Sequence, residues 1–325
     1  MMAAGVHFKA AEGVFSSAKS SRERFLAATF RGRTPAAKEA RRILRTQIGD
    51  ALDRLKGSQV TDEDIHAARK SIKRARATLR LLRETLPKNT YRQENAALRD
   101  SARPLSAVRD AKVLVDALDH LSELDTAAIS ETPAHPFRRA LVRERNNTRR
   151  RARSKTDGLG ASRSALEAAH SRAGRWSLDG QDWSVLGKGL QRVYAEGRKL
   201  LATAQREPAA ECLHEWRKQV KYLWNQVALL EPLGSGWINE LADQLHQLSD
   251  YLGDDHDLAV LRERVGAHEQ TFAKTEQHAA LVTAIERKRI GLQQKALVIG
   301  ARIYQDKPAD FAARFARDWR NWKSA

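Results

Sequence analysis

One nine-residue pattern occurs twice in this chain, and it restricts the possible folds more than any other feature of the sequence. Residues 65–73 and residues 213–221 both read apolar-His-x-x-Arg-Lys-x-apolar-Lys. Further along each half, residues 109–114 correspond to residues 256–261, and both stretches read x-Asp-x-x-Val-Leu. The shared order and nearly equal separation predict that one structural unit is written twice.

The repeated pattern has the periodicity of a helix. Ile65, Ala68, Ile72 and Leu79 recur at three- and four-residue steps and form one apolar stripe. Thr61 or Asp62 is expected to cap this helix, and Pro87 is expected to end it. The same reasoning predicts helices over 36–56, 63–86, 91–121 and 134–155, then over 184–205, 209–231, 236–266, 270–304 and 309–322.

These helices predict an all-α fold in which two four-helix bundles are related by pseudo-twofold symmetry. Repeat one is expected over about 31–155 and repeat two over about 184–325. The polar, glycine-containing stretch 156–183 is predicted to be the linker between them. Residues 1–30 are expected to form a loosely ordered leader.

The charge of the chain points to an anionic partner. Lys and Arg number 58 against 40 Asp and Glu, so the formal net charge is +18. Nucleic acid, polyphosphate and an acidic membrane face would each offset this excess. Cys212 is the only cysteine, which excludes an intramolecular disulfide, and no segment approaches the roughly 20 apolar residues of a membrane span. We therefore expect a soluble, cytoplasmic protein without membrane contact.

Cationic residues of the two copies lie beside the apolar stripe, where they could line a groove between helices. Guanidinium, ammonium and imidazole groups together suit phosphate oxygens. A solvated helix face is the simpler interpretation of one such row, but the repetition of residue types favours a binding site. The predicted binding residues are His66, Arg69, Lys70, Lys73 and Arg80, their counterparts His214, Arg217, Lys218 and Lys221, the first-helix residues Arg41, Arg45, Lys188 and Arg192, and the fourth-helix residues Arg143, Arg145, Arg287 and Arg289.

The histidine of each copy, and two tryptophans of the second copy, each have alternative roles. Neighbouring cations would depress the pKa of His66 and His214, so general-base chemistry is conceivable. Because no Ser or Cys nucleophile recurs in both copies, phosphate contact is the preferred role. The same cations would repel a metal ion, and neither a metal nor a cofactor is expected. Trp216 and Trp224 are interpreted as core residues, with base stacking as the alternative.

Asp110 and Asp257 are the acidic members of the repeated pattern. They could cap helices that Pro104 and Gly253 interrupt just upstream. They could equally position a lysine or histidine of the cationic rows. The sequence favours neither role over the other.

The doubled His-x-x-Arg-Lys-x-apolar-Lys pattern, with its Asp-x-x-Val-Leu elements, resembles the conserved-histidine α-helical domain family, CHAD, over nearly the whole chain from Phe30 to Trp322. The resemblance implies a basic central groove or pore that binds inorganic polyphosphate and is lined by the motif residues. Some relatives carry a triphosphatase-type domain marked by Glu-x-Glu-x-Lys, which this sequence lacks. The second copy is more acidic around Asp254 and Asp255 than the first, so the two halves are not expected to contribute equally to polyphosphate binding.

Polyphosphate binding without catalysis, which would target the protein to polyphosphate granules, is thus the first functional hypothesis. A nucleic-acid-binding helical protein is the alternative, favoured by net charge but lacking regularly interleaved aromatic residues. An enzyme acting on phosphoanhydrides ranks third, because no acidic metal-binding cluster is evident. The sequence leaves the oligomeric state open.

Overall fold

A computed structural model describes residues 29–325 of the chain, except residues 33, 58–59, 125–130, 155, 179, 181 and 268–275. This described part consists of helices joined by short connections and contains no strand. The expected all-α fold is therefore confirmed. The helices are α2 (Ala36–Leu55), α3 (Asp62–Leu81), α4 (Lys88–Ala102), α5 (Ser106–Leu124), α6 (Glu131–Ser154), α7 (Thr156–Ala173), α8 (Ser184–Arg206), α9 (Ala210–Leu229), η1 (Glu231–Leu233), α10 (Gly236–Ala267), α11 (Glu276–Ile303) and α12 (Pro308–Ser324).

Helix α3, which carries the first copy of the motif, begins where its sequence predicts. The Thr61 hydroxyl accepts a hydrogen bond from the Asp64 N–H at 3.1 Å, and the Asp64 carboxylate accepts one from the Thr61 N–H at 3.2 Å. This reciprocal capping box satisfies two amide groups that the first turn would otherwise leave unpaired. The apolar stripe that includes Ile72 and Leu79 is buried, as its periodicity predicts.

The expected third helix of the first half is two helices, α4 and α5, separated at Pro104. Proline has no N–H to donate to a carbonyl of the preceding turn, so the helix ends there even though Arg103 keeps helical backbone angles. Gly253, in contrast, does not interrupt α10, because glycine keeps its N–H and weakens a helix only modestly. Asp110 lies inside α5 and Asp257 lies inside α10, so neither aspartate caps a helix, which was one of the two roles that the sequence left open.

The stretch 156–183 was expected to be a linker, but most of it forms helix α7. Leu166, Ala169 and Ala173 are buried along one face of this helix. Through that face α7 packs against α2 and α4, so tertiary burial outweighs the glycines near its start. The predicted leader falls on residues 1–28, which lie outside the described residues, and the two residues after them.

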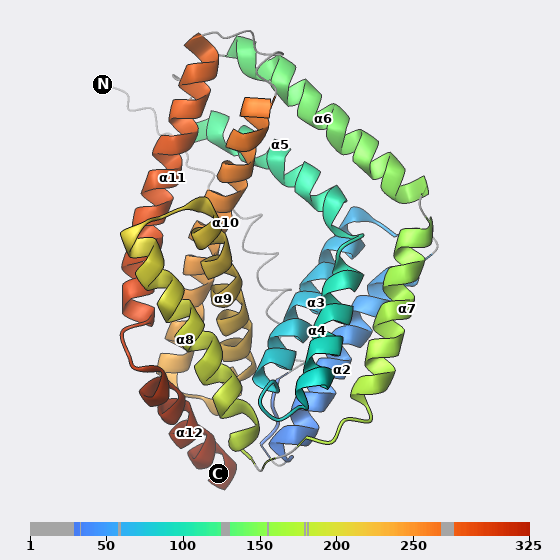
Figure 1. Cartoon of the computed structure of the whole chain (residues 1–325), viewed down its shortest axis with the longest axis vertical. Helices are drawn as coiled ribbons and strands as arrows, with labels where there is room; N and C mark the ends of the chain where they lie inside the picture. The colour runs from blue at the N-terminus through green and yellow to red at the C-terminus, as the bar shows by residue number, and fades with distance from the viewer. Residues whose placement is uncertain are drawn as a thin grey trace, which may run out of the picture.

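Two clusters of buried apolar side chains hold the helices together, and both draw on both halves of the sequence. The larger includes Ile43, Ile72, Leu190 and Val220, from α2, α3, α8 and α9. The smaller joins α5 and α6 to α10 and α11, and Phe137 is fully buried in it. Figure 1 shows α5 and α6 beside the ends of α10 and α11, away from α12. A duplicated two-bundle arrangement is compatible with this packing.

Helix α8 approaches the end of α3 at one glycine. A Cβ atom on Gly189 would clash with the backbone carbonyl oxygens of Arg80 and Leu81. Only a residue without a side chain permits this backbone contact. Within the described ranges, no helix is long and apolar enough to cross a bilayer.

Candidate anion-binding site

The two motif helices, α3 and α9, pack against each other. The Gln226 amide of α9 donates a hydrogen bond to the Ala77 carbonyl of α3 at 3.1 Å. The Arg80 guanidinium of α3 lies 3.7 Å from the centre of the Tyr222 ring of α9, a cation–π contact. These contacts bring the two cationic rows onto adjacent helices.

The cationic row of α9 surrounds a histidine of α10. The Nδ1 atoms of His214 and His256 are 3.2 Å apart, and the ring centroids are separated by 4.3 Å. Burial, followed by the positive field of Arg217, His214, Lys221 and Lys218, lowers the pKa of His256 to about 4. Burial and the neighbouring Lys218 and Arg217 also lower the pKa of His214. The structure therefore gathers the three cations of the second row, Arg217, Lys218 and Lys221, around an imidazole pair to which the fourth predicted residue, His214, belongs.

The row of α3 has two parts with different surroundings. His66 is exposed, and Lys70 and Lys73 are half-buried on the same helix. Arg69, however, is buried, and its guanidinium donates hydrogen bonds to the Ser106 hydroxyl and to the Ala102 carbonyl. Arg69 thus connects α3 to the junction of α4 and α5, and structural support is its evident role.

The corresponding arginine of α9 reaches the equivalent place on the third helix of its half. A Cβ atom on Gly253 of α10 would lie 3.6 Å from Nε and Nη2 of Arg217. In the repeat alignment, Gly253 of the second half matches Ser106 of the first. The two motif arginines therefore make related contacts, which agrees with a duplicated unit.

Arg80 also takes part in a cluster where α3, α4 and α9 meet. Its Nη1 donates a hydrogen bond to the Asn95 side-chain oxygen at 3.2 Å. Arg76 lies beside it within reach of the same oxygen, and burial lowers the pKa of Arg76. A guanidinium held in this way has less freedom to meet a ligand than the lysines of the row.

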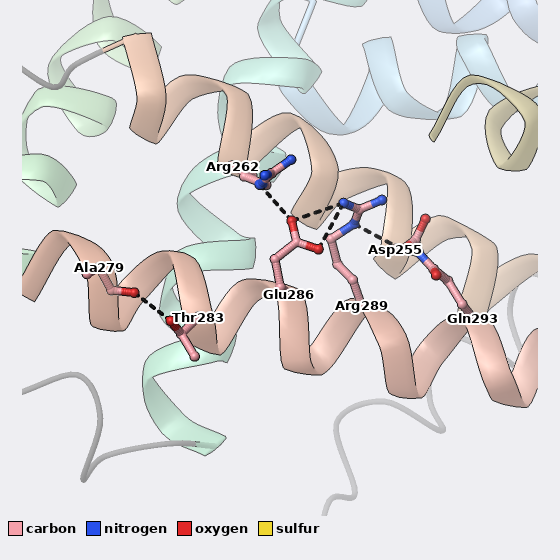
Figure 2. Close-up of polar contacts among 7 residues, drawn as sticks. All are labelled: Asp255, Arg262, Ala279, Thr283, Glu286, Arg289 and Gln293. Carbon is pink, nitrogen blue, oxygen red and sulfur yellow. Dashed lines mark hydrogen bonds and ion pairs between the residues drawn. The ribbon is translucent and has the colours of Figure 1, made fainter. Parts of the chain in front are cut away.

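Arg289 is the predicted binding residue that the structure contradicts most clearly. Its side chain is buried, and its Nε donates to the Asp255 carboxylate at 3.1 Å while its Nη1 lies 3.3 Å from Glu286. Figure 2 shows Gln293 and Arg262 completing this network between α10 and α11. Because two carboxylates neutralise the guanidinium, Arg289 stabilises the helix pair and is not available to an anion.

The remaining fourth-helix arginines are less buried than Arg289. Arg287 and Arg143 are exposed on α11 and α6, and Arg145 is half-buried on α6 beside the Asn146 side chain. Their assignment to the binding site stays a prediction.

The first-helix residues also separate into two groups. Arg41 and Arg45 of α2 face α7, where they line a groove with His170. Lys188 and Arg192 are exposed on α8, and Arg192 forms an ion pair with Glu84 at 3.3 Å.

The acidic residue of the second copy lies in a different environment from its counterpart. Asp257 lines a 440 Å³ pocket between α5, α10 and α11, together with Asp254, His120 and Lys288. Burial, Asp250 and Asp257 raise the pKa of Asp254. Asp110 is exposed on α5. Within the described residues, no group of three or more His, Cys, Asp or Glu side chains is arranged to hold a metal ion.

His256 is a site residue that sequence reasoning missed. It occupies the position of Arg109 in the repeat alignment, and the side chain of Arg109 lies outside the described residues. The alignment could have identified His256, because it pairs this histidine with Arg109, a cationic residue just before the repeated aspartate. The interpretation of Trp216 as a core residue is confirmed, since its side chain is fully buried. Trp224 is half-buried and packs edge-on against His246 at 4.6 Å between ring centroids.

Comparison with known proteins assigns the fold. No curated protein matches the sequence. Among solved structures, PptA from Streptomyces chartreusis superposes with a TM-score of 0.56 at 16% identity, covering 88% of this chain and 100% of that chain. The CHAD domain from the plant Ricinus communis superposes with a TM-score of 0.54 at 15% identity, covering 90% of this chain and 94% of that chain. The family model of the CHAD domain matches residues 42–266, and the chain therefore belongs to the CHAD domain family.

Proposed function

We propose that this protein binds inorganic polyphosphate along the cationic rows of α3 and α9. The observation that carries the proposal is the gathering of Arg217, Lys218 and Lys221 around the His214–His256 pair. Burial is the first cause of the low pKa of His256, and the positive charges of Arg217, Lys221 and Lys218 lower it further, although Lys218 also forms an ion pair with Glu215 at 2.5 Å. A chain of phosphates would supply negative charge beside these cations at several points along the two helices.

The aromatic residues of the site favour a polyanion without bases over a nucleic acid. Trp216 is buried in the core, and Tyr222 is already covered by the Arg80 guanidinium. Stacking of bases on exposed aromatic rings is what sequence-tolerant binders of single strands use. Nucleic acid is accordingly the competitor in the experiment, and inorganic polyphosphate is the expected ligand.

Binding is proposed to be the whole activity of the protein. The His214 and His256 rings lie beside cations, and their contact is with each other. Phosphoryl transfer to water requires a positioned nucleophile and, as a rule, a divalent ion. We extend the proposal to localisation: polyphosphate binding would retain the protein at polyphosphate granules.

The test is an equilibrium titration with long-chain polyphosphate at several salt concentrations. One variant replaces Lys70, Lys73, Lys218 and Lys221 with Gln. Its matched control loses the same charge on other surfaces, by replacing Arg198, Lys199, Arg302 and Arg320 of α8, α11 and α12, all of which are exposed.

We expect the row variant to bind more than about tenfold more weakly and with a shallower salt dependence, because fewer counterions are released. The control should stay close to the wild type. Equal losses in the two variants would show that diffuse net charge, and not the rows, holds the ligand. Stronger competition by single-stranded nucleic acid than by unlabelled polyphosphate would place the ligand in the other class.

A further inference from the structure

The pocket between α5, α10 and α11 is lined by none of the cations of the rows on α3 and α9. Its volume of 440 Å³ lies within the range that is typical of sites for small molecules. Helix α10 packs against both α5 and α11, so the lining comes from three helices that contact one another. We call this site the α10 pocket.

Part of the lining of the α10 pocket is apolar. Leu121, Leu258 and Leu292 come from the three different helices, and all three also belong to the smaller cluster of buried apolar side chains. The Tyr251 ring lines the pocket too, and the Lys295 ammonium lies 5.8 Å from the centre of this ring. An aliphatic segment of a ligand would leave water on contact with this surface.

Side chains of both charges complete the lining, and each charge comes from its own helices. The carboxylates are Asp116 of α5 and Asp254 and Asp257 of α10, whereas Lys288 and Lys295 both belong to α11. The two lysines are seven positions apart, so they lie on one side of α11 and about 10 Å apart along its axis. A ligand in the pocket would therefore meet carboxylates from two helices and ammonium groups from the third.

Negative charge outweighs positive charge around Asp254. Burial, Asp250 and Asp257 raise the pKa of this carboxyl group, although His120 and Lys288 act in the opposite direction. An ammonium group beside Asp254 would relieve this crowding of like charges. In the described part of the chain, no three His, Cys, Asp or Glu side chains are arranged to hold a metal ion. The carboxylates therefore suit separate ammonium groups better than one compact cation.

We propose that the α10 pocket binds a free diamino acid, such as L-lysine or ornithine. The ammonium groups of the ligand pair with the aspartates of α5 and α10, its carboxylate pairs with the lysines of α11, and its aliphatic chain lies against the leucines. Three aspartates and two lysines leave a formal excess of one negative charge in the lining, and a diamino acid carries one positive charge. The proposal uses no cation of the rows and does not rest on polyphosphate binding.

The test is calorimetric titration of the full chain with L-lysine and with cadaverine, which is L-lysine without its carboxylate. The two pocket variants are Asp254→Asn and Lys288→Gln. Each has a control on the same helix that loses the same charge, Asp243→Asn on α10 and Arg302→Gln on α11, and both control positions are exposed.

We expect L-lysine to bind the wild type and both controls alike, and to bind each pocket variant about tenfold more weakly, because one charge-assisted contact is lost. Lys288→Gln should not weaken the binding of cadaverine, since cadaverine has no carboxylate for this lysine to contact. A general loss of structure would weaken both ligands together.

Three results would overturn the inference. The first is the absence of L-lysine binding to the wild type. The second is an equal loss of L-lysine affinity in Asp254→Asn and Asp243→Asn, which would assign the binding to diffuse surface charge. The third is wild-type binding of cadaverine as tight as that of L-lysine, which would make the pocket a site for diamines.

Discussion

The His214–His256 pair predicts that polyphosphate binding takes up protons. Burial and the surrounding cations hold the pKa of His256 at about 4, so the free protein carries this ring uncharged at pH 7. A bound phosphate would favour the protonated ring and raise its pKa toward the ordinary value of about 6.5. Protons then bind to the complex and not to the free protein. Affinity must therefore rise as the pH falls from 7 to 5.

The size of the effect follows from the two pKa values. Complete restoration of the pKa from about 4 to about 6.5 would raise affinity about 20-fold between pH 7 and pH 5. The ring is only half-buried, so solvent and salt screening reduce the expected change to about fivefold. The pKa of His214 is shifted in the same direction and adds to the trend.

The assay is the titration of long-chain polyphosphate at pH 7, 6 and 5 and constant ionic strength, with two variants of one residue. His256→Gln keeps a polar side chain but cannot titrate, so it should lose the contribution of His256 to the pH dependence. His256→Arg restores the type of residue that the first half has at Arg109, and should bind more tightly than the wild type at pH 7. A wild-type affinity that is flat with pH, or a His256→Gln variant as steep as the wild type, would refute the reasoning.

Three further outcomes follow from the structure. Gly189→Ala should lower the free energy of unfolding by about 1–3 kcal/mol in a denaturant titration, because its methyl group meets backbone atoms. The control Gly291→Ala has nothing within 4 Å of the new methyl group and should raise the free energy of unfolding by up to about 1 kcal/mol. Equal effects of the two substitutions would contradict the close approach of α8 to α3. Asp255→Ala should lower the free energy of unfolding by about 1–3 kcal/mol, since the buried Arg289 guanidinium loses its carboxylate partner on α10 and keeps only Glu286, and an unchanged melting curve would show that the ion pair is dispensable. Purified wild type should release no phosphate from polyphosphate over hours, and steady release that disappears in a His66→Gln, His214→Gln variant would make the protein an enzyme.

The helical fold could be predicted from the sequence because its signals are local. The apolar period of α3 and the Thr61 cap depend only on neighbouring residues, and both predictions are confirmed. Helix α7 could not be predicted in the same way. Its glycines weaken a helix in isolation, and the burial of Leu166 against other helices becomes evident only in the folded chain.

The sequence predicted which types of residue form the candidate site, but not which of their charges are accessible to an anion. Repetition identified the rows of α3 and α9, yet the sequence did not reveal which cations are already neutralised. Arg289 has its carboxylate partner Asp255 on another helix, and Arg69 donates a hydrogen bond to Ser106 at the junction of α4 and α5. Both pairings depend on how the helices pack, and no spacing along the chain specifies that.

The sharing of both apolar clusters between the two halves bears on how such a chain could have arisen. A single half, separated after α7, would expose the side of α3 that now meets α8 and α9, and the side of α5 that now meets α10. Apolar surfaces of this kind drive association in water. If the chain arose by duplication, a single copy would have needed a second copy to bury these surfaces, and joining the two into one polypeptide would have removed the dependence of stability on concentration. The joined copies could then diverge, as at position 109, where an arginine corresponds to the histidine at position 256.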